Sequence, residues 1–282
     1  MGIFANPLTD LLEYEDFSRD FLKGTDPVGM TGCIDSEKVH FMSTFLGEKK
    51  VQLVVTYSEQ RAREIEEDYK LFCSQVYVIP PRDLIFFSAD LQGNAIIAER
   101  MKAFAALYQN EAKVIITTMD ALMSAAVPFE QLMSHVIKLK EGDELDLEKL
   151  KHDLTVMGYE RVGRVEEPGQ FTVHGGIADV YPLTMEVPVR IELWGDEIDS
   201  IRSFDAESQR SLENLEEITI YPAVEHPGEK AQLSFLDYFP AQKSVVFLDE
   251  PNRLVEKGQA VEEEYNQSRL HRAEKGEKNL PE

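Results

Sequence analysis

The chain has 282 residues, 43% of them hydrophobic, and its 52 acidic and 29 basic residues give a formal net charge of −23. This length can bury one sizeable core and a second, smaller one. No apolar run reaches the roughly 20 residues that a membrane span requires. Because duplex DNA repels a strongly acidic surface, the charge argues against autonomous DNA binding and favours docking on basic protein surfaces.

The cysteines and histidines indicate no metal or disulfide framework. Cys33 and Cys73 lie far apart without the spacing of a zinc site, and the six histidines are scattered. We therefore expect no metal, no other cofactor and no disulfide, as in a protein of the reducing cytoplasm. The first residues also lack the apolar core of a signal peptide, so we expect a cytoplasmic protein without membrane contact.

Helices and strands alternate through residues 1–127. Helices are expected at residues 7–23, 34–46, 56–72 and 94–109. Apolar strands are expected at residues 28–30, 51–55, 76–79 and 114–116. Thr56 and Glu59 have the spacing of a capping box at the start of the third helix. Such alternation predicts an α/β domain with a doubly wound parallel sheet.

The pattern changes near residue 128 and changes back beyond residue 221. An acidic turn at 141–144 and a helix at 147–157 precede a strand-rich segment, and a strand at 245–248 and a charged helix at 252–273 follow it. We therefore predict a discontinuous α/β domain formed by residues 1–127 and 215–282. An inserted α+β domain at residues 128–214 interrupts it.

The strand-rich segment, residues 169–205, predicts a compact antiparallel sheet. Apolar and polar residues alternate at 171–174 and again at 190–193, which is the period of half-buried strands. Gly195-Asp196 stands between two strand-like runs, as in a tight hairpin. The alternation weakens after Ile198, where we expect a bulge.

A phosphate-binding loop is not recognisable. Residues 29–36 stand where a strand meets a helix, but a working loop reads Gly-x-x-x-x-Gly-Lys-Ser/Thr and no Lys follows these glycines. Nowhere in the chain does Gly-Lys-Ser/Thr occur. Asp249 and Glu250 follow an apolar strand, as in the magnesium-binding strand of an ATPase, but acids also favour helix N-termini. We interpret both as capping residues and expect no catalytic residue.

Residues 169–205 resemble one domain that the UvrB family shares with the transcription-repair coupling factor family. The motifs that carry the resemblance are Ile-x-Asp-x-Tyr-Pro at 177–182, Arg-Ile-Glu-Leu-Trp-Gly-Asp-Glu-Ile at 190–198 and Ser-Phe-Asp at 203–205. The rest of the chain is collinear with the same module. The resemblance implies a degenerate P-loop NTPase-like (RecA-like) domain, interrupted by an inserted UvrB-type domain 2.

Two features favour the coupling factors over UvrB. The phosphate loop is degenerate, and residues 80–90 are short where UvrB carries a long Tyr-rich hairpin that threads damaged DNA. By resemblance, the chain would be a monomeric N-terminal module that recruits UvrA by mimicking UvrB and catalyses nothing itself. Further domains of the parent protein, absent from this sequence, would bind RNA polymerase and translocate on duplex DNA.

The resemblance also implies the residues that contact UvrA, which are Arg161, Thr172, His174, Tyr181 and Arg190. Tyr159-Glu160-Arg161 matches the Tyr-x-Arg that begins the UvrA-facing region of UvrB-like domains. Thr172 and His174 replace two arginines of the UvrB segment Phe-Arg-Val-Arg-Gly. A neutral imidazole would contribute less than an arginine at pH 7.

Two other functions stay open. The first is a structural, autoinhibitory clamp on the translocase motor that has lost UvrA binding, which the substitutions at Thr172 and His174 favour. The second is a nucleotide-hydrolysing domain of DNA repair, which the missing lysine and the acidity oppose.

Overall fold

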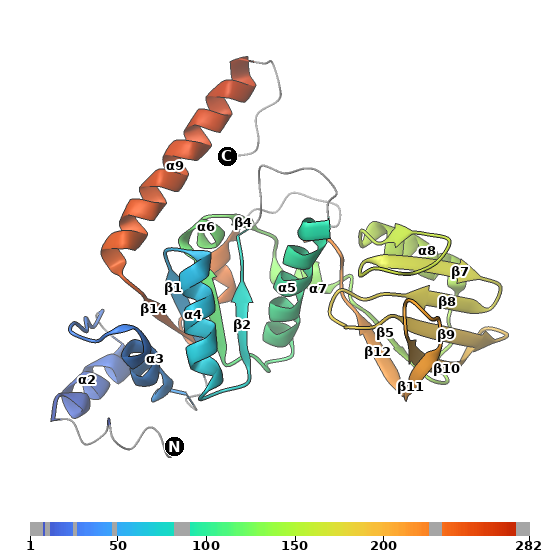
Figure 1. Ribbon diagram of the computed structural model, residues 1–282, viewed down its shortest axis with the longest axis horizontal. Helices are drawn as coiled ribbons and strands as arrows, with labels where there is room; N and C mark the ends of the chain where they lie inside the picture. The colour runs from blue at the N-terminus through green and yellow to red at the C-terminus, as the bar shows by residue number, and fades with distance from the viewer. Residues whose placement is uncertain are drawn as a thin grey trace. The chain divides into compact units, whose positions relative to one another are not determined.

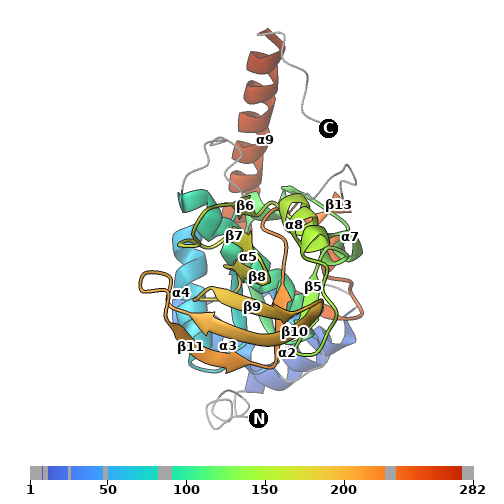
Figure 2. The ribbon, with the colours of Figure 1, turned by 90° about the vertical axis from the view of Figure 1, so that its right-hand side faces the viewer.

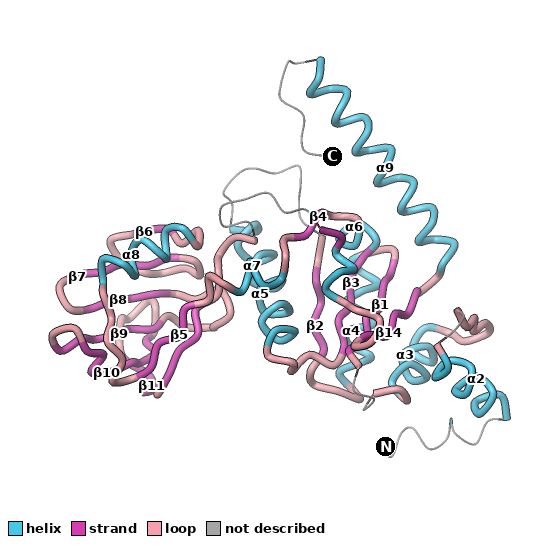
Figure 3. Tube along the Cα trace, turned by 180° about the vertical axis from the view of Figure 1, so that it is seen from behind, coloured by secondary structure: helices cyan, strands magenta, loops and turns pink. Residues whose placement is uncertain are grey.

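The computed structural model describes residue 8 and residues 12–24, 27–46, 50–81, 91–225 and 233–274. The chain divides into two compact units. Unit 1 comprises residues 1–81, 111–123 and 239–282, and unit 2 comprises residues 82–110 and 124–238. Figure 3 shows helices interleaved with strands in unit 1 and a strand-rich second unit.

Unit 1 is built on a parallel sheet with the strand order β14-β1-β3-β2 (Figure 1). Its strands are β1 (Val51–Thr56), β2 (Val76–Ile79), β3 (Val114–Thr118) and β14 (Ser244–Leu248). Every residue of β3 is buried, as expected for an apolar strand at the centre of a parallel sheet. The α/β class with a parallel sheet is thereby confirmed.

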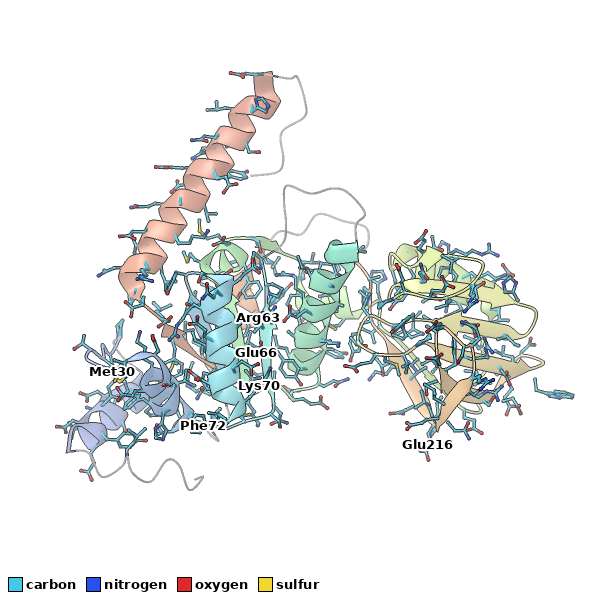
Figure 4. All side chains as sticks on the ribbon, viewed as in Figure 1. Met30, Arg63, Glu66, Lys70, Phe72 and Glu216 are labelled. Carbon is cyan, nitrogen blue, oxygen red and sulfur yellow. The ribbon has the colours of Figure 1, made fainter. Side chains whose placement is uncertain are left out.

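The helices of unit 1 are α2 (Leu12–Lys23), α3 (Asp35–Ser43), α4 (Glu59–Lys70), α6 (Met119–Leu122) and α9 (Pro251–Glu274). Helix α4 buries Ala62, Ile65 and Tyr69. Its outer surface carries an ion-pair network in which the Glu66 carboxylate lies 3.2 Å from both Arg63 and Lys70 (Figure 4). The helix is amphipathic, and its sequence spacing fixes which side meets the core.

Two local predictions for unit 1 are wrong. Residues 28–30 form no strand, and Val28 and Met30 remain more than one-third exposed. Gly29 and Gly32, the latter at φ +87°, weaken an extended run, which explains the error. The cap of α4 is Ser58, whose hydroxyl accepts a hydrogen bond from the backbone N–H of Arg61, and not Thr56. Residues 82–90, most of the segment compared with the UvrB hairpin, lie outside the described residues.

Unit 2 is dominated by a six-stranded sheet with the order β11-β10-β9-β8-β7-β6 (Figure 2). The strands are β6 (Glu160–Arg161), β7 (Gln170–His174), β8 (Ile177–Val180), β9 (Val189–Trp194), β10 (Glu197–Phe204) and β11 (Ser211–Leu215). The unit also contains α5 (Leu91–Tyr108), α7 (Phe129–Met133), α8 (Leu147–Val156) and a 3-10 turn, η1 (Phe235–Tyr238). Two short two-stranded sheets complete the unit and pair β12 (Glu217–Ile220) with β5 (Ile137–Lys140) and β13 (Leu233–Ser234) with β4 (Ala125–Ala126).

The hairpin and the bulge expected in this sheet are confirmed. Trp194 pairs with Glu197 across the Gly195-Asp196 turn, where Gly195 has φ +67°. The register of β9 against β10 then shifts between Ile198 and Ser200. A left-handed glycine suits the twist of a tight hairpin, and the bulge increases the local twist of β10.

The core of unit 2 lies on one face of this sheet. Phe171, Val180 and Val189 stand in register on adjacent strands and are buried, and α8 packs against β7. Leu150 and Leu154 are the buried residues of α8. The alternate residues of the same strands are therefore free to form a polar face. None of the described helices has the length and apolar character needed to cross a membrane.

Residues 221–225 follow the six-stranded sheet in the chain, and buried polar contacts hold them to the rest of unit 2. The Tyr159 hydroxyl donates to the carbonyl of Tyr221 at 2.8 Å, and burial raises the pKa of Tyr159 above its ordinary value. Arg100 on α5 forms an ion pair with Glu225, and both side chains are at least nine-tenths buried. Residues 221–225 are therefore an integral part of this unit and not a loose linker.

Candidate protein-binding surface

Two rows of side chains cross one face of the six-stranded sheet. Thr172, Asp179, Arg190 and Arg202 occupy matched positions on β7, β8, β9 and β10. His174, Ile177, Glu192 and Ser200 form the next row on the same strands. Since residues two apart on a strand share a face, the two rows together make one surface, which we call the polar face.

Arg190 is fixed at the centre of the polar face by a bidentate ion pair. Its Nε and Nη2 atoms each donate to a carboxylate oxygen of Asp179 at 2.7 Å. The guanidinium also lies over the Phe204 ring, 4.8 Å from its centroid. The hydrogen bond to Asp179 raises the pKa of Arg190 above its ordinary value. Much of the hydrogen-bonding capacity of this predicted contact residue is therefore used within the domain.

Thr172 and His174 also interact with each other. The Thr172 hydroxyl lies 2.9 Å from Nε2 of His174, and the threonine is buried whereas the histidine is exposed. The hydroxyl thus helps to orient the imidazole at the open end of the polar face.

Arg161 and Tyr181 occupy different surroundings. Arg161 is exposed on the edge strand β6. Its register partner on β7 is the buried Phe171, whereas the polar-face residue of β7 is the next one, Thr172. Tyr181 is half-buried, and its hydroxyl donates to the carbonyl of Glu186 at 2.6 Å. Burial raises its pKa. The structure thus brings together Thr172, His174 and Arg190, and leaves Arg161 apart from them at the sheet edge.

Three charged residues of the polar face were missed by sequence reasoning. Glu192 forms an ion pair with Arg202, whose Nε is buried without a hydrogen-bond partner among the described residues. Asp179 holds Arg190, as described above. Only the cross-strand register would have revealed these pairs, because nothing in the local sequence marks Asp179, Glu192 or Arg202 as neighbours.

The carboxyl end of the parallel sheet in unit 1 carries a separate ionic cluster. The Asp249 carboxylate accepts hydrogen bonds from Thr56 Oγ1 at 3.0 Å, Arg61 Nε at 3.3 Å and Lys38 Nζ at 3.2 Å. Its side chain is only 3% exposed. The interpretation of Asp249 as a helix cap is therefore wrong, since this carboxylate is the buried acceptor of three side chains.

Lys38 links Asp249 to Glu250, whose carboxylate lies 2.5 Å from the ammonium. Burial alone would lower the pKa of Lys38, but the hydrogen bonds to Glu250 and Asp249 raise it above its ordinary value. Arg61 is also paired with Glu64 at 3.1 Å. Both cations of the cluster are thus paired with carboxylates within it. Among the described residues, no group of three or more His, Cys, Asp or Glu is arranged to hold a metal ion.

The chain has clear relatives among known proteins. Residues 137–226 match the family described as UvrB interaction domain. The transcription-repair-coupling factor of Staphylococcus haemolyticus is 34% identical over 210 residues, which cover 73% of this chain and 18% of the relative. Those of Staphylococcus aureus strain Mu50 and Staphylococcus epidermidis are 32% and 31% identical, each over 80% of this chain and 19% of the relative.

The chain spans less than a fifth of the length of these relatives. The matched family covers the whole polar face, β5, α8 and residues 221–225. The chain is accordingly a UvrB-like module of the transcription-repair coupling factor family, with a UvrB interaction domain at residues 137–226.

Proposed function

We propose that this module recruits UvrA of the nucleotide-excision repair system to stalled RNA polymerase by presenting a UvrB-like docking surface. The observation that carries the proposal is the match of residues 137–226 to the UvrB interaction domain family. The surface consists of the polar face together with the exposed Arg161 at the β6 edge. A net charge of −23 is compatible with docking on a partner surface rich in Lys and Arg.

The α/β part has the role of a scaffold in this proposal. We infer that residues 1–127 and 215–282 are a degenerate NTPase-like domain around the inserted domain at 128–214. Two arguments support the loss of nucleotide chemistry: no lysine follows the glycines of residues 29–36, and Asp249 is neutralised by Lys38 and Arg61. The module is then a non-catalytic monomer. RNA polymerase and duplex DNA are contacted by parts of the parent protein outside this sequence.

An autoinhibitory clamp on the motor is the second candidate function. The specific observation in its favour is that Arg190 is paired with Asp179 and that Thr172 and His174 interact with each other. A polar face with so few free cations has less to offer acidic groups of UvrA. On this alternative, the module would bind the motor domains and not UvrA.

Calorimetric titration of purified UvrA into the 282-residue chain tests the proposal. We expect saturable binding that is lost when residues 137–226 are deleted and retained by a variant altered only in unit 1, such as Leu71→Ala. The exposed side chain of Leu71 makes this variant a suitable control for handling and folding. Absence of binding to UvrA, together with binding to the separately purified motor domains, would favour the clamp.

A further inference from the structure

The sole tryptophan of the chain, Trp194, is the most exposed large hydrophobic residue that the structure describes. It exposes 83% of its surface at the end of β9, against 73% for Leu71, the next in order. Tryptophan is highly buried on average in folded proteins. A ring this accessible on the matched domain therefore requires an explanation beyond the core of unit 2.

The hairpin that carries Trp194 is well braced. Trp194 pairs with Glu197 across the turn, and the acidic turn at residues 141–145 supports the same hairpin with backbone hydrogen bonds. The Leu145 N–H donates to the carbonyl of Asp196 at 2.8 Å, and the Ile198 N–H donates to the carbonyl of Asp143 at 2.9 Å. A ring on a fixed backbone loses less conformational freedom on docking than one on a mobile loop.

Trp194 lies at the end of the polar face. It stands two residues beyond Glu192 on β9, so the strand alternation directs both side chains to the same side of the sheet. Glu192 is in register with Ile177, which is 39% exposed, and Ile177 pairs with the exposed His174. The register thus places Trp194, Ile177 and His174 on the same side of the sheet near the hairpin, and we call these three exposed residues the tryptophan patch.

Three exposed carboxylates lie at the hairpin end of this patch. Asp196 and Glu197 follow Trp194 in the hairpin, and all three are exposed. Glu144, also exposed, forms an isolated bridge with Glu197 and brings a third acid to the same place. An apolar ring within an acidic rim is complementary to an apolar pocket that is edged by Lys or Arg.

We propose that Trp194 is the anchor of partner docking and that it inserts into an apolar pocket on UvrA whose rim is basic. The inference rests on the proposed function and adds the residue that supplies most of the contact energy. Tryptophan is enriched among the few interface residues that dominate binding, and these residues are desolvated and ringed by weaker polar contacts. The arginines of the polar face then contribute orientation, since Arg190 is held by Asp179.

The test compares the full chain with Trp194→Ala, Trp194→Phe and the control Leu71→Ala in calorimetric titrations with purified UvrA. We expect Trp194→Ala to weaken binding at least about tenfold, as for a hot-spot residue. Trp194→Phe should remain within about threefold because the aromatic area is largely kept, and Leu71→Ala should match the parent. Thermal unfolding of each variant checks that the fold is intact.

A second measurement uses the fact that the chain has one tryptophan. Incorporation of 5-fluorotryptophan gives a single fluorine resonance, which should shift or broaden on addition of UvrA and stay unchanged on addition of serum albumin. If the parent chain binds UvrA but Trp194→Ala binds equally well and the resonance does not move, the anchor is wrong and the proposed function stands. If the parent chain does not bind UvrA, both the proposed function and the anchor are overturned.

Discussion

Arg190 and Asp179 form a two-point ion pair between adjacent strands, with both nitrogen–oxygen distances at 2.7 Å. The carboxylate is only 9% exposed and the arginine 23%. Planar bidentate pairing of this kind cannot be reproduced by lysine. The central arginine of the polar face therefore serves first to join β8 to β9, and its contribution to a partner depends on that pair.

Removal of either member of this pair is expected to lower the free energy of unfolding. Arg190→Ala leaves a largely buried carboxylate without its partner, which we expect to cost about 1–3 kcal/mol for this partly exposed pair. Urea denaturation of Arg190→Ala, Asp179→Ala and the double variant measures the coupling, expected at about 0.5–3 kcal/mol for residues in contact. Strict additivity of the two single effects would show that the ion pair stabilises nothing.

Arg161 is the predicted contact most free to meet a partner, because it is exposed at the edge of the sheet. We expect Arg161→Ala to weaken UvrA binding at least about tenfold, or roughly 1.4 kcal/mol. Lys149→Ala on α8 is the matched loss of one positive charge within the same domain and should have little effect. Equal affinities of Arg161→Ala and the parent in the calorimeter would remove the β6 edge from the docking surface.

We expect the chain to bind no ATP. Lys38 and Arg61 are already paired with the buried Asp249, so neither is free to neutralise a triphosphate. Asp249 in turn has its oxygens occupied by Thr56, Arg61 and Lys38 and is not available to a magnesium ion. Calorimetric titration with magnesium and ATP should give only the heat of dilution. Micromolar affinity that is abolished by Asp249→Ala would refute this expectation.

Gly158 ends α8 in a conformation and a space that only glycine suits. It has φ +87°, and a Cβ at this position would lie 2.6 Å from Cγ1 of Val224. Gly158→Ala should therefore destabilise unit 2 by about 1–3 kcal/mol through backbone strain and overpacking. Gly163→Ala is the matched control, since nothing lies within 4 Å of a Cβ there. Equal melting temperatures for the two variants would contradict the prediction.

The sequence predicted the elements of this fold best where one physical signal dominated. The apolar run that forms β3 and the Gly195-Asp196 hairpin were both predicted correctly. A strand that is buried on both faces has consecutive apolar residues, and a tight hairpin with a left-handed turn favours glycine. The strand predicted at residues 28–30 does not form, because Gly29 and Gly32 weaken an extended run that has only two apolar side chains, Val28 and Met30. A strand prediction from the apolar residues alone leaves out this effect of the glycines.

The candidate surface was harder to predict than the fold. Its individual residues could be named from a family resemblance, but their pairing required the cross-strand register. Arg190 was expected to face a partner, yet its nearest carboxylate is Asp179 on the neighbouring strand. Trp194 was not among the predicted contact residues, although the structure shows it exposed on the matched domain.

Competition with UvrB tests the central claim most directly, because mimicry requires that both proteins use one site on UvrA. A fluorescently labelled UvrB is bound to purified UvrA, and the unlabelled 282-residue chain is titrated into the complex while the anisotropy is followed. We expect the chain to displace UvrB completely and Arg161→Ala to require at least about tenfold more protein. A ternary complex in which the chain and UvrB occupy UvrA together would contradict the account.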